Sequence, residues 1–141
     1  MPTSWIRERT LLPVALLLTV GACGGNWEHA LVGTPRAPGA DGVVQVEEIE
    51  GGNRLVTVVV SNLLPPRRLG AELGTYVVWL TGRGGHADKA GVLEYDEESR
   101  QGNMFATTPH RRMELRITAE RHGRVSAPGD AIVIRRSIET E

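Results

Sequence analysis

The chain contains a single cysteine, Cys23, and the residues before it indicate what its thiol could do. A short segment with Arg7 and Arg9 comes first, and residues 11–20 are apolar except for one threonine and one proline. Two small residues then precede the cysteine. A basic region, an apolar core and small residues at a cleavage site are typical of an export signal. We therefore predict that residues 1–22 are a signal peptide and that Cys23 stands at the cleavage point.

The end of this signal resembles the lipobox of bacterial lipoproteins, with the residues Val20-Gly21-Ala22-Cys23. The resemblance implies that the Cys23 thiol receives a diacylglyceryl group, that Cys23 becomes the N-terminus, and that acyl chains such as palmitate anchor the protein. One chain holds a protein only reversibly, but two or three hold it stably. Val20 replaces the leucine that is usual at its position, so secretion without lipid stays open as an alternative.

A membrane-spanning helix is the third interpretation of the same segment. Such a helix needs about 20 apolar residues. The apolar run is shorter, contains Pro13 and is followed by Gly24 and Gly25. We therefore favour a lipid anchor that holds the protein in the cell envelope, facing the periplasm or the exterior. The two glycines carry no acidic retention signal of the enteric type, which favours the outer membrane over the inner.

Three acidic residues, Asp96, Glu97 and Glu98, could bind a hard cation such as calcium. They follow Tyr95 in a predicted hairpin loop. However, the run lacks the alternating oxygen ligands and the turn glycine of an EF-hand loop. A solvated acidic loop is the favoured interpretation.

His86 and Asp88 follow a glycine cluster at 82, 84 and 85, where a phosphate or a metal ion could bind. The spacing of a phosphate-binding loop is absent, and so is a strand-loop-helix context. No zinc-ligand spacing is present at the other histidines, which are His29, His110 and His122. We predict no metal and no cofactor.

Catalytic nucleophiles have no visible support in this sequence. A Gly-x-Ser-x-Gly elbow would expose a serine for attack, and none is present. The candidate serines are Ser61, Ser99, Ser126 and Ser137. We predict no catalytic residue, no small-molecule substrate and no enzyme activity.

Charge and aromatic content bear on nucleic acids and sugars. Signal removal takes Arg7, Arg9 and Glu8 from totals of 16 basic and 17 acidic residues, so the exported chain is slightly negative. The basic pairs lack the interleaved aromatics of a nucleic-acid groove, so we predict no nucleic-acid partner; they are Arg67-Arg68, Arg111-Arg112 and Arg135-Arg136. Tyr76 and Trp79 could form a sugar-stacking platform, but they lie three apart on a predicted strand and face opposite sides. We expect Trp79 to be buried in the centre of the sandwich.

The elements that must position these residues are predicted to be strands. Val56, Val58 and Val60 lie in a run that suggests a central strand. Alternation of apolar and charged residues is plainest from Met113 to Glu120. The expected strands are 43–49, 55–60, 76–80, 91–95, 104–107, 113–120 and 131–138.

Turn residues separate these strands, for example Glu50-Gly51-Gly52-Asn53, which predicts a hairpin. About seven short strands in one small domain predict an all-β, antiparallel, immunoglobulin-like sandwich at residues 42–141, with a small barrel as the alternative. Residues 69–73 could form at most one helical turn. We expect Val58, Val78, Leu80, Leu115, Ile117 and Ile134 to be buried, and Glu114, Arg116 and Glu120 to face solvent.

Residues 23–41 are predicted to be the lipidated N-terminus and a Gly/Pro-rich tether. A flexible chain of this length would span about 23 Å root-mean-square. Trp27 and the apolar residues that follow are unusual in a linker, so residues 27–32 could instead form a short first strand.

The order of several short motifs resembles the C-terminal extracytoplasmic domain of anti-sigma-K factors. The most recognisable are Gly74-Thr75-Tyr76-Val77-Val78-Trp79-Leu80 and Lys89-Ala90-Gly91-Val92-Leu93. Uncharacterised lipoproteins of delta-proteobacteria are similar over the same region, about residues 40–136. The chain lacks the sigma-binding segment of those factors, so the resemblance implies a sandwich outside the cytoplasm and does not imply sigma control.

These features predict a lipid-anchored envelope protein that acts as a non-catalytic interaction or structural module. Its expected partners are the membrane, through the lipid on Cys23, and another envelope protein. The alternative is a lipoprotein that binds carbohydrate or peptidoglycan, which would require an exposed aromatic or polar groove.

Overall fold

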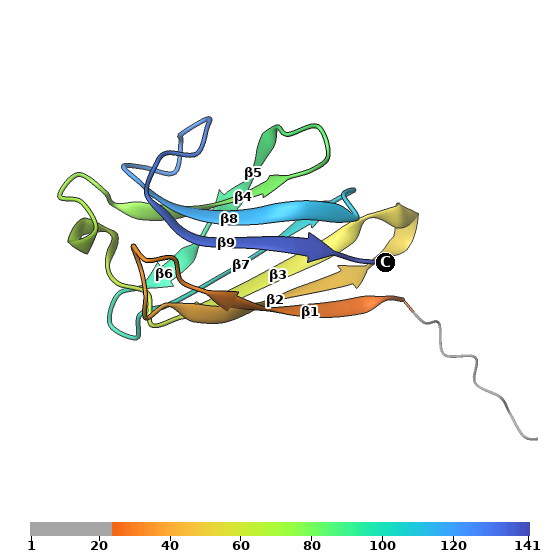
Figure 1. Ribbon diagram of the computed structural model, residues 1–141, viewed down its shortest axis with the longest axis horizontal. Coiled ribbons are helices and arrows are strands. Elements are labelled where there is room, and N and C mark those ends of the chain that lie inside the picture. Colours follow the sequence, from red (N-terminus) through yellow and green to blue (C-terminus); the bar gives the residue numbers. More distant parts are fainter. Residues whose placement is uncertain (1–23) are drawn as a thin grey trace, which may run out of the picture.

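The computed structural model describes residues 24–141, and these residues form two antiparallel sheets packed face to face (Figure 1). The five-stranded sheet has the order β1-β2-β3-β7-β6. Its strands are β1 (Asn26–Val32), β2 (Asp41–Glu48), β3 (Arg54–Ser61), β7 (Gln101–Thr108) and β6 (Glu94–Asp96). The four-stranded sheet has the order β5-β4-β8-β9. Its strands are β5 (Ala87–Val92), β4 (Thr75–Thr81), β8 (Arg112–Glu120) and β9 (Ile132–Glu139).

The strand order is that of an immunoglobulin-like sandwich with one added strand. In the first sheet, the immunoglobulin strands A, B, E and D correspond to β2, β3, β7 and β6. In the second sheet, strands C′, C, F and G correspond to β5, β4, β8 and β9. The added strand is β1, which extends the first sheet beyond β2. The predicted antiparallel sandwich is thus confirmed, with nine strands in place of about seven.

Residues 27–32, which the sequence allowed to be either tether or strand, belong to strand β1. It pairs with β2 from Asn26 to Val32, and Leu31 is buried in the core. The amide of Glu48 also donates a hydrogen bond to the carbonyl of Gly25 (3.0 Å). Residues 27–32 therefore form a strand, and the sandwich includes residues N-terminal to the expected boundary at 42. The signal segment and Cys23 lie outside the described residues.

The predicted strand at 91–95 was wrong, and the alternative of a helical turn at 69–73 is not realised. Residues 91–95 do not form one strand, because the chain leaves the four-stranded sheet at Val92 and joins the other sheet at Glu94, with Leu93 buried between them. The β-branched and aromatic pattern was continuous there, but no turn residue marked the crossing. Residues 69–73 are not helical; a 3₁₀ turn, η2 (Pro66–Arg68), precedes them, and another, η1 (Glu50–Gly52), lies in the predicted hairpin.

The core lies between the sheets and contains the six residues expected there. Val58, Val78, Leu115, Ile117 and Ile134 have no exposed surface, and Leu80 is 3% exposed. The six residues named from the sequence therefore lie in the core, and the alternation from Met113 to Glu120 identified the inner face of β8 correctly.

A buried arginine, Arg54, closes one end of this core and is 1% exposed. Its Nε donates to Oγ1 of Thr140 (3.1 Å), and its Nη1 donates to the carbonyls of Gly52 (3.0 Å) and Pro109 (3.4 Å). The side chain thereby ties the β2–β3 turn, the β7–β8 turn and the C-terminus together.

Glu120 was expected to face solvent, but it is 7% exposed. Its Oε1 accepts hydrogen bonds from Oγ1 of Thr118 (2.6 Å) and from the amide of Gly129 (2.7 Å). The loop between β8 and β9 folds back over the strand end, which the sequence pattern of one strand could not show. Glu114 and Arg116 are partly exposed.

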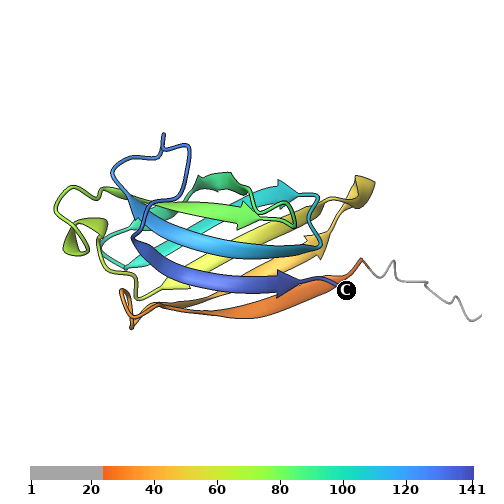
Figure 2. The ribbon, with the colours of Figure 1, turned by 45° about the horizontal axis from the view of Figure 1, so that its top comes forward.

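Trp79 is fully buried, but on the opposite side of β4 from the sandwich core. Tyr76 takes the inner position that we had assigned to Trp79. The β8–β9 loop lies against this outer face, because Nζ of Lys89 donates to the carbonyls of Gly123 (2.9 Å) and Val125 (3.1 Å). Figure 2 shows this loop outside the four-stranded sheet.

The described residues contain no helix with the length and apolar content of a membrane span.

Candidate functional site

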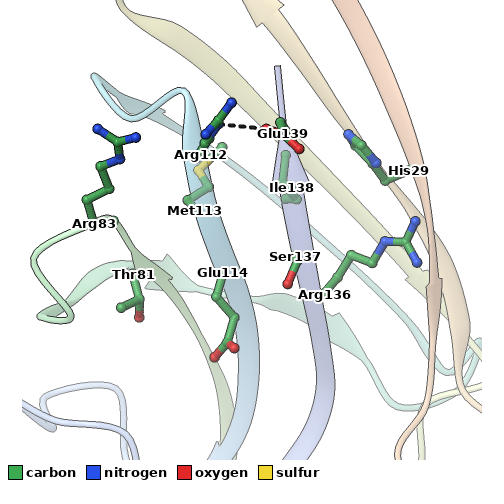
Figure 3. Close-up of a pocket in the computed structure, with 11 residues that line it drawn as sticks. His29, Thr81, Arg83, Arg112, Met113, Glu114, Arg136, Ser137, Ile138 and Glu139 are labelled. Atoms are coloured by element: carbon green, nitrogen blue, oxygen red, sulfur yellow. Dashed lines mark ion pairs between the residues drawn. The ribbon is translucent and has the colours of Figure 1, made fainter. Parts of the chain in front are cut away.

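A cleft with a volume of about 510 Å³ lies along the edge strand β9 (Figure 3). Its lining comes from β4, β8, β9 and His29 of β1. Consecutive residues of a strand point to opposite faces, so Arg136 and Ser137 line it from two sides of β9. The cleft is therefore a hollow around a sheet edge and not a cavity within one face.

Most charges in this cleft are already paired. Nε of Arg112 lies 2.6 Å from Oε1 of Glu139, and its Nη2 lies 2.7 Å from Oε2 of Glu141. Glu114 contacts Arg116 (2.6 Å) and also Arg135 at the longer distance of 3.6 Å. Two polar atoms that border the cleft, Nε2 of His29 and Oγ1 of Thr81, are buried without a hydrogen-bond partner among residues 24–141. Arg83, which follows β4, and Arg136 also line the cleft and form no ion pair with a residue in 24–141, so the lining combines closed ion pairs with two unpaired guanidinium groups.

The acidic run lies where β6 turns into β7. Both carboxylate oxygens of Glu97 contact the guanidinium of Arg67, and Oδ1 of Asp96 accepts from the amide of Glu98 (2.9 Å). Within residues 24–141, no group of three or more His, Cys, Asp or Glu side chains is placed to hold a metal ion.

The structure brings His110 to the pair that the sequence had singled out. Nε2 of His86 lies 3.6 Å from Oδ1 of Asp88, and Nε2 of His110 lies 3.4 Å from Oδ2 of the same carboxylate. The sequence had no signal for His110, which comes from the β7–β8 turn. His29 is on β1, and His122 is in the β8–β9 loop.

The candidate serines are not brought together. Ser61 ends β3, and Ser99 is in the β6–β7 turn. Ser126 is in the β8–β9 loop, and Ser137 is on β9. The arginine pairs are also dispersed. Arg67-Arg68 is in η2, Arg111-Arg112 is at the start of β8, and Arg135-Arg136 is in β9.

The proposed sugar platform is absent from the described surface, because Tyr76 and Trp79 are both buried. Tyr76 and Tyr95 instead pack edge to face, with ring centroids 5.4 Å apart. Their hydroxyls donate to the carbonyls of Leu64 and Leu63, respectively. Burial raises the pKa of the Tyr76 phenol far above its ordinary value, and Tyr95 raises it further. Burial is also the main cause of the raised pKa of Tyr95, followed by the carboxylate of Glu97.

An apolar group lies on the outer face of the five-stranded sheet. Phe105 of β7 is 76% exposed and Val59 of β3 is 48% exposed, while Val43 and Leu55 are partly exposed. Val43 is paired with Val59, and Phe105 is paired with Thr57 between Leu55 and Val59. Diagonal neighbours in a ladder lie within reach of an aromatic ring. These four residues therefore form one cluster, whereas isolated exposed apolar residues are ordinary.

Acidic residues flank this cluster on two sides of the same face. The register places Glu28 on β1 and both Asp41 and Glu47 on β2, while Glu94 and Asp96 stand on the opposite edge strand, β6. All five are exposed. No arginine or lysine is among the outward-facing residues of these five strands. We call the cluster and these five carboxylates the carboxylate-rimmed face.

Comparisons of the chain with protein-family models, with curated proteins and with solved structures found no match. The motifs that carried the resemblance lie in paired strands, because Val78 of β4 is opposite Gly91 of β5. Their structural role is to form the centre and edge of the four-stranded sheet, so they do not lie on the carboxylate-rimmed face.

The carboxylate-rimmed face was not predicted from the sequence. A signal was present in part, since Phe105 is flanked by Met104 and Ala106 in a predicted strand, and the alternation assigns it to the other side. Phe105 lies beside Val43 and Val59 only because β7, β3 and β2 are neighbouring strands, and this strand order could not be predicted from the sequence.

Proposed function

We propose that this protein is a lipid-anchored protein of the bacterial cell envelope that binds another protein and catalyses no reaction. The observation that carries the proposal is the carboxylate-rimmed face, in which Phe105 and Val59 expose apolar surface between carboxylates on β1 and β2 and carboxylates on β6. Interfaces of this kind join an apolar centre to a polar rim. The lipobox-like residues before Cys23 support the anchor.

The anchor and the sandwich would be separated by very little chain. Only Gly24 and Gly25 lie between Cys23 and β1, and Gly25 is already hydrogen-bonded to Glu48. Two extended residues span at most about 7 Å. A lipid on Cys23 would therefore hold the sandwich directly at the membrane, without the flexible tether predicted from the sequence.

The start of β1 and the C-terminus lie at the same end of the sandwich (Figures 1 and 2). The turn between β2 and β3 is also at this end, because Asn26 pairs with Glu47. In an anchored protein this end would face the membrane, and the outer face of the five-stranded sheet would be open to neighbours at the side. A partner in or beside the same membrane could then reach the carboxylate-rimmed face.

The resemblance to the extracytoplasmic domain of anti-sigma-K factors supports a sandwich outside the cytoplasm. Binding of carbohydrate or peptidoglycan has less support, since the aromatic pair on which it depended, Tyr76 and Trp79, is buried.

The anchor is tested by Cys23→Ser in growing cells. We expect loss of labelling by radioactive palmitate and movement of the protein from the membrane to the soluble fraction. If the variant stays on membranes and still requires detergent for release, the lipid anchor is wrong.

The binding role is tested by a photo-crosslinking amino acid at position 105 in intact cells, with position 124 in the β8–β9 loop as the matched control. We expect a discrete protein adduct from position 105 and none from position 124. Absence of a protein adduct at 105, or equal adducts at both positions, would contradict the proposal.

A further inference from the structure

The charge of the carboxylate-rimmed face is not neutralised within the described chain. Glu28 accepts a hydrogen bond from Nε2 of Gln45 (3.0 Å), and Asp41 accepts one from Nδ2 of Asn62 (2.7 Å). Both donors are neutral amides. None of the five rim carboxylates forms an ion pair with a residue in 24–141. The face therefore carries a local negative potential around its apolar cluster.

This potential excludes two occupants. A second copy that used the same face would bring five carboxylates against five, and like charges across an interface cost several kcal/mol. An anionic lipid surface would be repelled for the same reason.

The outer face of the four-stranded sheet of a second copy is also a poor match. Arg116 on that face is paired with Glu114 and Arg112 with Glu139, and the β8–β9 loop lies against the face at Lys89. Its large aromatic residue, Trp79, is fully buried, so this face offers no aromatic group to the apolar cluster.

We propose that the carboxylate-rimmed face binds a protein surface that has an apolar centre flanked by lysines or arginines. This inference rests on the proposed function and adds the chemistry of the partner. Phe105 is the expected energetic centre, because a protruding aromatic side chain can fill a pocket of the partner. The rim carboxylates accelerate association and select the partner by charge, so binding weakens with salt.

The test uses the mature lipoprotein in non-ionic detergent micelles, labelled with ¹⁵N. The probe is a short synthetic peptide with a Val-Phe-Val centre and two lysines on each side. A second peptide has glutamates in place of the lysines. We expect the lysine peptide to shift the amide resonances of Leu55, Val59 and Phe105, and the glutamate peptide to leave them unchanged. A rise from 50 to 300 mM salt should weaken the binding at least about tenfold, because exposed charges are screened.

Variants separate this face from acidity in general. The triple variant Glu28→Lys/Asp41→Lys/Glu94→Lys should lose at least about tenfold in affinity for the lysine peptide, and Phe105→Ser should do the same. The matched control Glu50→Lys/Glu72→Lys/Glu98→Lys changes exposed acidic residues elsewhere and should bind as the wild type does. Preserved amide spectra of each variant show that it is folded.

Equal binding of the two peptides, shifts outside this face, or a loss in the control variant would overturn the proposed partner chemistry. These outcomes are independent of the anchor, since Cys23→Ser tests only membrane association. A crosslink from position 105 to a partner segment without lysine or arginine would refute the partner chemistry and leave the binding role intact.

Discussion

The indole Nε1 of Trp79 donates a hydrogen bond to Oγ1 of Thr118, 2.9 Å away on the neighbouring strand. Thr118 in turn donates to Glu120, which accepts from the β8–β9 loop at Gly129. This chain of contacts connects the outer side of the four-stranded sheet to the loop above it. Trp79 is therefore not a surface for stacking sugars; it is buried and holds Thr118 by a hydrogen bond.

Thr118→Val tests this connection. The change keeps the shape of the side chain but leaves the Trp79 indole and the Glu120 carboxylate each without one buried partner. We expect a loss of about 1–3 kcal/mol in the free energy of unfolding, measured by urea denaturation. Thr57→Val on the outer face of the other sheet is the control and should change stability by less than about 0.5 kcal/mol. Equal stability of the two variants would contradict the role of Thr118.

The two tyrosines, Tyr76 and Tyr95, should ionise at a higher pH than free tyrosine, whose pKa is about 10. Burial raises the pKa of both phenols, and the sequence contains no other tyrosine. The unfolded chain therefore loses these protons first as the pH rises. Stability is retained below about pH 10 and falls above it. Absorbance at 295 nm should rise near pH 10 in guanidinium but only at higher pH in the native protein; a native rise near pH 10 would contradict the packing.

A chain that begins at Gly42 should be much less stable than one that begins at Gly24. The shorter chain lacks β1 and the buried side chain of Leu31, and it leaves the edge of β2 unpaired. Removing one buried leucine side chain alone costs about 2–5 kcal/mol, against a total of about 5–15 kcal/mol for a small domain. Thermal melts followed by circular dichroism compare the two chains. Identical melting temperatures would show that β1 adds no stability.

Arg54→Met should cost about 1.5–3 kcal/mol or more, because hydrogen bonds from a charged donor to Thr140 and Gly52 are lost. Arg124→Met, at an exposed loop position, is the control and should change stability little. Urea denaturation measures both. A variant as stable as the wild type would show that the cost of burying the guanidinium offsets its hydrogen bonds.

Treatment with EDTA should leave the melting temperature unchanged. A cation bound to the native acidic turn would raise the melting temperature by mass action, so its removal would lower it. Glu97 is held by Arg67, and Asp96 accepts a backbone hydrogen bond. A fall of several degrees on addition of EDTA would show a bound ion, and the Asp96–Glu98 turn would be examined first by substitution.

The sequence alone was sufficient for the fold class and for the inner face of β8, but on β4 it assigned Trp79 to the core position that Tyr76 takes. Alternation with a period of two specifies which side of a strand is apolar, so Ile117 and Leu115 could be assigned to the core before any contact was known. Glycine-rich turns likewise predicted the hairpin between β2 and β3. Both signals depend only on residues that are neighbours in the sequence, because side-chain alternation and turn geometry are properties of a short segment of backbone.

The tertiary structure decided what stands on the outer faces. Trp79 and Glu120 stand on the outer face of the four-stranded sheet, yet both are buried. The β8–β9 loop lies against this face through Lys89 and Glu120, and it is distant in sequence from Trp79. Phe105, Val43 and Val59 form one surface only because β7, β3 and β2 are neighbours in that register. Alternation distinguishes inside from outside within one strand, but neighbour order is set by the packing of the whole sandwich.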